Sequence, residues 1–126
     1  MSFSLDFDQS QVLATVVADG DKGNATRLEA LSALRMHPKF HADCRILCDF
    51  LNNSSTPVRA DCLDLGLTLS AYFRGQKIAL VVDDIEFAKL KEGVSVFNTG
   101  RVEIVVFKDV RSAMVWLLSE HEAIAA

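Results

Sequence analysis

Cysteine, proline and tryptophan are scarce in this sequence. It contains three cysteines, two prolines and one tryptophan among 126 residues. The cysteines, Cys44, Cys48 and Cys62, include no Cys-x-x-Cys pair, and an odd number without such a pair is not a disulfide framework. We therefore expect three free thiols, with Cys44 and Cys48 on one buried face of a strand.

Positive charge is also limited. Thirteen Lys and Arg stand against 17 Asp and Glu, which gives a formal net charge of -4, and no stretch concentrates basic residues. Because phosphate attraction dominates nucleic-acid binding, we expect no nucleic-acid partner. The N-terminus carries Asp6 and Asp8 where a signal peptide carries bases, and no apolar run approaches about 18 residues. These absences predict a soluble, cytoplasmic protein without an integral membrane segment.

The residues that are present alternate between strand and helix patterns. Half of them are hydrophobic, and the length suits one domain spanning residues 1–126. The expected strands cover residues 3–8, 12–18, 45–50, 77–83 and 102–107. The first two should form an antiparallel hairpin, and strands separated by helices should pair in parallel. We predict an α/β fold: a single mixed, mostly parallel five-stranded sheet with an antiparallel N-terminal edge hairpin and about four helices.

Capping residues mark the expected helix starts. Thr26 and Glu29 have the spacing of a capping box, which predicts that the first helix begins at Thr26. Asp84 and Asp109 are expected to cap the two C-terminal helices, because an aspartate side chain accepts hydrogen bonds from the free amides of a first turn.

Residues 63–73 fit two patterns. Leucines at alternate positions are typical of a strand, but leucine is a strong helix former and the run exceeds ten positions. We predict a helix that is closed by Gly75.

Such a helix would have an apolar outer side. Leu63 and Leu67 would lie away from the buried stripe, beside Ser70 and Arg74. Because a second apolar side is usually covered by a copy of the chain or by another protein, these four residues form the predicted partner-binding surface. A homodimer through this helix is the concrete expectation.

Acidic and amide side chains follow the expected parallel strands. Asp49, Asn52, Asp83 and Asp84 should gather on one rim, where open parallel sheets bind ligands. Paired carboxylates there could act as acid and base, although helix capping is the commoner role of such aspartates. No nucleophile elbow, catalytic triad or phosphate loop accompanies them, so we predict no catalysis.

Two clusters have the residue types of metal sites. Residues 19–23 open like a calcium loop, but the sixth position holds Asn24 rather than glycine. His37, His41 and Cys44 are zinc-ligating types, but no fourth ligand has a recognisable spacing. We predict neither a metal nor a cofactor.

The order of these elements resembles the SpoIIAA-like (STAS/SEC14-type) small α/β domains over nearly the whole chain. The most specific piece is Val-Phe-Lys-Asp-Val-Arg-Ser-Ala-Met-Val-Trp-Leu, residues 106–117. It is similar to a pattern of that family, in which a strand and a Phe are followed by Ala-x-x-Trp-Leu. These motifs serve packing rather than chemistry.

The resemblance implies two kinds of function. Anti-sigma-factor antagonists of this type carry a phosphorylatable serine in Asp-Ser-Ser-Gly after the third strand, and SEC14-type carriers hold a lipid. The matching loop here is Asn52-Asn53-Ser54-Ser55-Thr56, with Asn in place of Asp and Thr in place of Gly. Ser54 and Ser55 are the candidate phosphoacceptors that the resemblance implies.

We predict a non-enzymatic binding or regulatory module that acts through protein-protein contacts, by self-association or with another protein. One alternative is a binder of a small ligand or lipid, with a groove near the C-terminal ends of the strands. The other is a phosphorylatable switch like the anti-sigma-factor antagonists.

Overall fold

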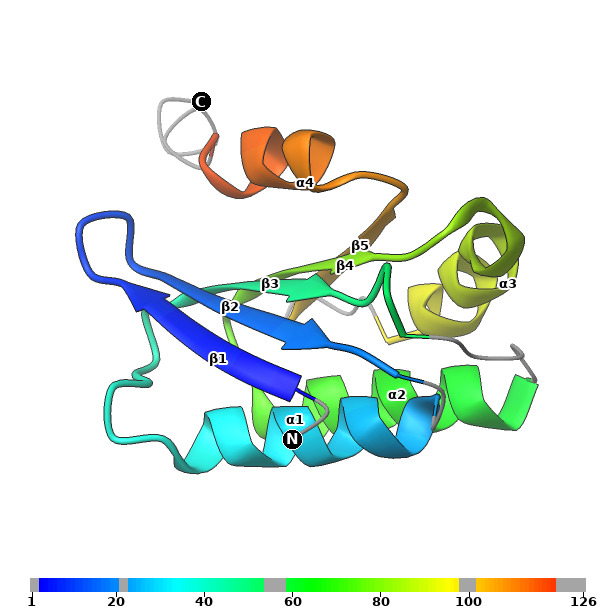
Figure 1. The fold of residues 1–126 in the computed structure, drawn as a ribbon, viewed down its shortest axis with the longest axis horizontal. Helices are drawn as coiled ribbons and strands as arrows, with labels where there is room; N and C mark the ends of the chain where they lie inside the picture. The colour runs from blue at the N-terminus through cyan, green and yellow to red at the C-terminus, as the bar shows by residue number, and fades with distance from the viewer. Residues whose placement is uncertain (1–2, 21–22, 54–58, 98–101, 120–126) are drawn as a thin grey trace.

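In a computed structural model of the chain, the described residues form five strands and four helices (Figure 1). Those residues are 3–20, 23–53, 59–97 and 102–119. The elements in chain order are β1 (Phe3–Asp8), β2 (Leu13–Ala18), α1 (Asn24–Met36), β3 (Arg45–Asp49), α2 (Arg59–Tyr72), β4 (Lys77–Val81), α3 (Asp84–Ser95), β5 (Glu103–Phe107) and α4 (Val110–Leu117).

The strands form one sheet in the order β1-β2-β3-β4-β5. β1 and β2 pair antiparallel and the other neighbours pair in parallel, which confirms the predicted fold class. Parallel neighbours require a crossover, and successive right-handed crossovers in one direction place their helices on one face. Accordingly α1 and α2 lie on one side of the sheet and α4 on the other (Figure 1).

Alternate residues of each strand supply two separate cores. In β3, Ile46 and Cys48 face the large cluster formed with α1, α2 and α3, whereas Leu47 faces the smaller cluster under α4. This alternation is the two-residue period of a strand, and apolar residues on both faces are what a buried parallel sheet requires. β1 alternates between half-buried and exposed residues, as predicted for an edge strand.

The segment with alternating leucines is helical, as predicted. Leu65, Leu69 and Phe73 are fully buried in the large cluster, because the helical period places them on one side of α2. The neighbouring helix α3 approaches closely at Gly93, where a Cβ atom would lie 2.5 Å from the Cβ of Cys62. Packing on two sides therefore fixes the position of α2 against both the sheet and α3.

Two of the three predicted caps are wrong. α1 begins at Asn24 after Gly23, whose φ of 57° is a left-handed conformation that glycine tolerates, so Thr26 lies buried inside the first turn. α3 is capped by Asp83, whose side chain accepts a 3.0 Å hydrogen bond from the backbone N–H of Glu86. In both cases the helix starts earlier than the sequence pattern indicated.

The predicted cap of α4 is confirmed. Asp109 accepts a 2.7 Å hydrogen bond from the backbone N–H of Ser112 and a second bond from the Ser112 hydroxyl. These bonds hold the pKa of Asp109 below its ordinary value, because they stabilise the charged carboxylate.

The cap of α3 can be tested with two adjacent variants. Asp83→Ala should lower the free energy of unfolding by about 1 kcal/mol, because it removes the acceptor for a first-turn amide. Asp84→Ala should change it by less than about 0.5 kcal/mol, since among the described residues Asp84 makes only an exposed ion pair with Lys108. Urea unfolding followed by circular dichroism measures both, and equal losses would contradict this cap assignment.

Candidate functional site

Three loops meet at the C-terminal ends of β2, β3 and β4. The backbone N–H of Gly20 donates to the carbonyl of Asn52 at 3.1 Å, and Gly20 and Asn53 form an isolated parallel bridge. The loop after β3 turns back on itself, with the N–H of Asn53 donating to the carbonyl of Phe50 at 3.1 Å. This rim is where open parallel sheets bind ligands.

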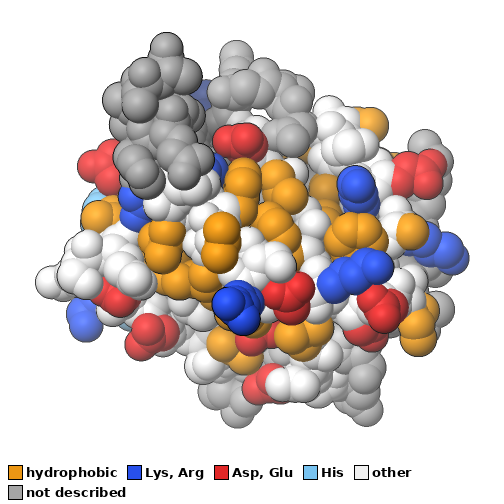
Figure 2. Space-filling model, turned by 90° about the horizontal axis from the view of Figure 1, so that it is seen from above, with side chains coloured by type: hydrophobic (Ala, Val, Ile, Leu, Met, Phe, Trp, Pro, Cys, Tyr) orange, Lys and Arg blue, Asp and Glu red, His pale blue; other side chains and the backbone are white. Residues whose placement is uncertain are grey.

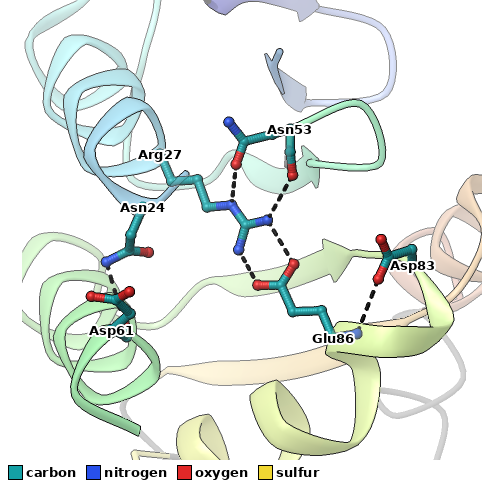
Figure 3. A network of polar contacts seen from close by, with 6 residues as sticks. All are labelled: Asn24, Arg27, Asn53, Asp61, Asp83 and Glu86. Atoms are coloured by element: carbon teal, nitrogen blue, oxygen red, sulfur yellow. Dashed lines mark hydrogen bonds and ion pairs between the residues drawn. The ribbon is translucent and has the colours of Figure 1, made fainter. Parts of the chain in front are cut away.

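A buried arginine lies at this rim, between Asn53 and Glu86 (Figure 3). Arg27, on α1, is 1% exposed. Its Nε donates to Asn53 Oδ1 at 2.7 Å, and its Nη2 donates to Glu86 Oε1 at 2.7 Å and to the Asn53 carbonyl at 3.3 Å. Its Nη1 donates to Glu86 Oε2, so arginine and carboxylate form a bidentate pair. The guanidinium carbon lies 4.8 Å from the centre of the Phe50 ring.

The partners of Arg27 are themselves held in place. Glu86 belongs to the first turn of α3, which Asp83 caps, and Asn53 Nδ2 donates to the Asp19 carbonyl at 3.3 Å. A buried ion pair offsets its desolvation only when its geometry is good and its remaining groups are hydrogen-bonded, and this network meets both conditions. We call Arg27, Asn53 and Glu86 the rim clamp.

The residues predicted as a ligand rim have local structural partners. Asp49 accepts a 3.2 Å hydrogen bond from the Leu51 amide, and Asp83 caps α3. Asp84 is exposed and lies 3.5 Å from the Nζ of Lys108. Of the predicted loop, Asn52 is exposed and Asn53 belongs to the rim clamp. Ser54, Ser55 and Thr56, the other predicted residues of this loop, lie outside the described residues.

Sequence reasoning missed Arg27 and Glu86, although a signal for both was present. Arg27 precedes Leu31 and Leu34 by four and seven positions, and Glu86 precedes Leu90 and Val94 by four and eight, so each shares the buried side of its helix. Two charges of opposite sign at core positions of two helices are the pattern that could have identified the pair.

The predicted partner-binding surface lies on the outer side of α2. Leu67 is 58% exposed and Arg74 is exposed, whereas Leu63 and Ser70 are half-buried. Ser70 Oγ donates to the Leu67 carbonyl at 3.0 Å. α2 runs beside α1 in the same direction, with Asn24 contacting the Asp61 carbonyl at one end and Arg35 stacked over the Tyr72 ring at the other.

The face that carries α4 also shows hydrophobic side chains at its centre, with charged side chains among and around them (Figure 2). Part of this apolar surface is already used, because Phe107, Val110, Met114 and Trp116 pack against the small cluster. Val115, on α4, is 67% exposed. This face is therefore a second surface to weigh against α2.

The cysteine thiols are free and buried, as predicted. Burial raises the pKa of Cys48 to about 12, with the charge of Asp49 acting in the same direction and that of Arg27 against it. Burial also raises the pKa of Cys62, assisted by the charge of Glu86. At neutral pH the Cys48 thiol is protonated and thus a poor nucleophile.

Among the described residues, no three His, Cys, Asp or Glu side chains come close enough together to hold a metal ion. Within the same part of the chain, no helix combines the length and the apolar character needed to cross a membrane.

Comparison with known proteins identifies the fold. The chain matches the crystal structure of an uncharacterised protein of the DUF3478 family with a SpoIIAA-like fold from Shewanella loihica. The TM-score is 0.54 at 20% sequence identity, over 92% of this chain and 94% of the other. The fold is SpoIIAA-like. No protein-family model and no curated protein matches the chain. At this identity the SpoIIAA-like relative shows the fold alone.

The rim clamp can be tested by removing one charge and then both. Arg27→Met should lower the free energy of unfolding by about 3–5 kcal/mol, because it leaves the Glu86 carboxylate buried without its partner. Adding Glu86→Leu should recover much of that loss, since no buried charge then remains. Urea unfolding measures the two single variants, Arg27→Met and Glu86→Leu, and the double variant. A double variant as unstable as the sum of the two single variants would contradict the coupling of this pair.

Thiol accessibility gives a second test. At pH 8, iodoacetamide should alkylate Cys48 in the folded protein at least about 100-fold more slowly than in urea, because burial and the raised pKa both suppress the thiolate. Mass spectrometry of digested samples measures the labelling of each cysteine. Equal rates for Cys48 in the two states would contradict the buried, protonated thiol.

Proposed function

We propose that this chain is a non-enzymatic binding module that acts through protein-protein contacts made by the outer side of α2. The observation that carries the proposal is the 58% exposure of Leu67 in the middle of a helix whose opposite side is fully buried. Leu63, half-buried one turn earlier, extends the apolar surface.

The packing of α2 against the rest of the fold supports a binding role. Its inner side packs on the sheet and on α3, so the outer side is held in one position before any partner arrives. A preorganised surface loses less conformational entropy on binding than a mobile one. Exposed apolar side chains contribute most to association when they sit on such a rigid element.

The chemistry of the rim supports the non-enzymatic part of the proposal. The Arg27 guanidinium and the Glu86 carboxylate are directed at each other, and Asp83 is engaged in capping α3. A general acid or base needs a carboxyl group directed at a substrate instead. The same network occupies the place where a small ligand or lipid would enter between the strand ends, so the alternative of a ligand groove has less support.

A lysine substitution with a matched control tests the surface. Leu67→Lys should abolish association, because it places a charge in the apolar contact, whereas Val115→Lys on α4 should leave association intact. The measurement is the mass of the tagged protein on a denaturing gel after chemical cross-linking inside its source cells, which also retains a contact too weak to survive dilution in an extract. Wild type and Val115→Lys should migrate well above the 13.9 kDa monomer, and Leu67→Lys close to it.

Three outcomes would contradict the proposal. Wild-type protein that migrates as a monomer would remove the evidence for any stable protein contact. A Leu67→Lys variant that keeps its assembly would place the contact elsewhere. Loss of assembly in Val115→Lys alone would assign the contact to the face that carries α4.

A further inference from the structure

Four exposed residues form a row along the outer side of α2. Asp64, Leu67, Ala71 and Arg74 recur at spacings of three, four and three residues. Arg74 lies two residues after Tyr72, the last residue of α2, and the N–H of the intervening Phe73 still donates to the Leu69 carbonyl at 3.0 Å. Residues at these spacings lie one above another on a helix. The row therefore has an acid at one end, a base at the other, and a leucine and an alanine between them.

The row is self-complementary under a two-fold rotation. In the sequence, Asp64 and Arg74 lie five residues before and five residues after Leu69. Leu67 and Ala71 lie two residues before and two residues after it. At 1.5 Å per helical residue, Leu67 and Ala71 lie about 3 Å from the level of Leu69 and Asp64 about 7.5 Å, while Arg74 lies just beyond the end of the helix on the opposite side. If a second α2 lies antiparallel with its Leu69 at the same level, Asp64 of each copy lies opposite Arg74 of the other. Leu67 of each copy then lies opposite Ala71 of the other.

We propose that the partner of α2 is a second copy of this chain, docked antiparallel along this row by a two-fold axis. The inference rests on the proposed function of α2 and specifies its partner. Each Asp64 meets Arg74 of the other copy, and each Leu67 packs on the other Ala71. Such an interface is isologous and closes at two subunits.

Size and charge both select this arrangement. A leucine opposite an alanine lets two helix axes approach to about 8–10 Å without a gap or a clash. A parallel pairing would set Asp64 against Asp64 and Arg74 against Arg74, and such like-charge contacts disfavour a partner orientation. The antiparallel pairing turns all four of these charges into attractive contacts.

The contact is small, so the dimer should be reversible. Stable interfaces bury about 1,200–2,000 Å² in total, and one pair of helices joined through four residues each lies at the low end of that range or below it. We therefore expect a dissociation constant of the order of 100 µM, with weakening by salt because the ion pairs are exposed.

Exchange of the two charges tests the pairing. The variants are Asp64→Arg, Arg74→Asp and the double variant, compared with wild type by sedimentation equilibrium of the full chain at low salt. Each single variant should raise the dissociation constant at least about tenfold, because it places like charges at both ends of the row. The double variant should return to within about threefold of wild type, because it exchanges every pair and so restores attraction.

Arg111→Asp is the control, because it changes the net charge as Arg74→Asp does but lies exposed on α4, on the other side of the sheet. It should leave the dissociation constant within about threefold of wild type. Circular dichroism checks that each variant keeps the fold.

Some results would overturn the inference. Wild type that stays monomeric up to about 0.5 mM would do so, as would single variants that dimerise like wild type or a double variant that is not restored. These results differ from failure of the proposed function. If Leu67→Lys loses its assembly in cells while the pure protein is monomeric, α2 binds a different protein and only this inference fails.

Discussion

The bidentate pair between Arg27 and Glu86 is the interaction on which the rest of the structure depends. It joins α1 to the first turn of α3, and through Asn53 it holds the loop that leads from β3 towards α2. The helices α1 and α3 are thereby joined at one point at the end of the sheet. This charge pair, with Arg27 1% and Glu86 5% exposed, tolerates little displacement, because separating the partners leaves an uncompensated charge in the core.

The rim clamp also affects where a partner or ligand can bind. In open α/β sheets the strand ends are the usual ligand site, and here that place holds an arginine, an amide and a carboxylate that satisfy one another. The side chains available to a partner therefore lie on the outer side of the helices, away from the rim clamp. Because a SpoIIAA-like fold by itself specifies no activity, the case for binding rests on the exposed row of α2 and its charges.

Periodicity predicted the sheet and its antiparallel edge, because both depend on which side of an element is apolar. The helical state of residues 63–73 was predicted from their leucine content and length instead, since their alternation is typical of a strand. The helix starts were less predictable: the left-handed Gly23 and the choice of Asp83 over its neighbour are set by how the chain leaves a strand. Arg27 and Glu86 were not predicted as a buried pair, because a charged residue is ordinarily assigned to the exposed surface and only the tertiary fold brings these two together.

The central claim is that association occurs along α2 while the rim stays closed. Amide NMR spectra of isotope-labelled protein, recorded from about 20 µM to about 1 mM, test it most directly, because a dissociation constant in between changes the population of free and bound chains. The account predicts concentration-dependent shifts centred on residues 60–74, with the amides of Asn53 and Glu86 unchanged. Spectra that do not change, or shifts centred on the strand rim or on α4, would contradict it.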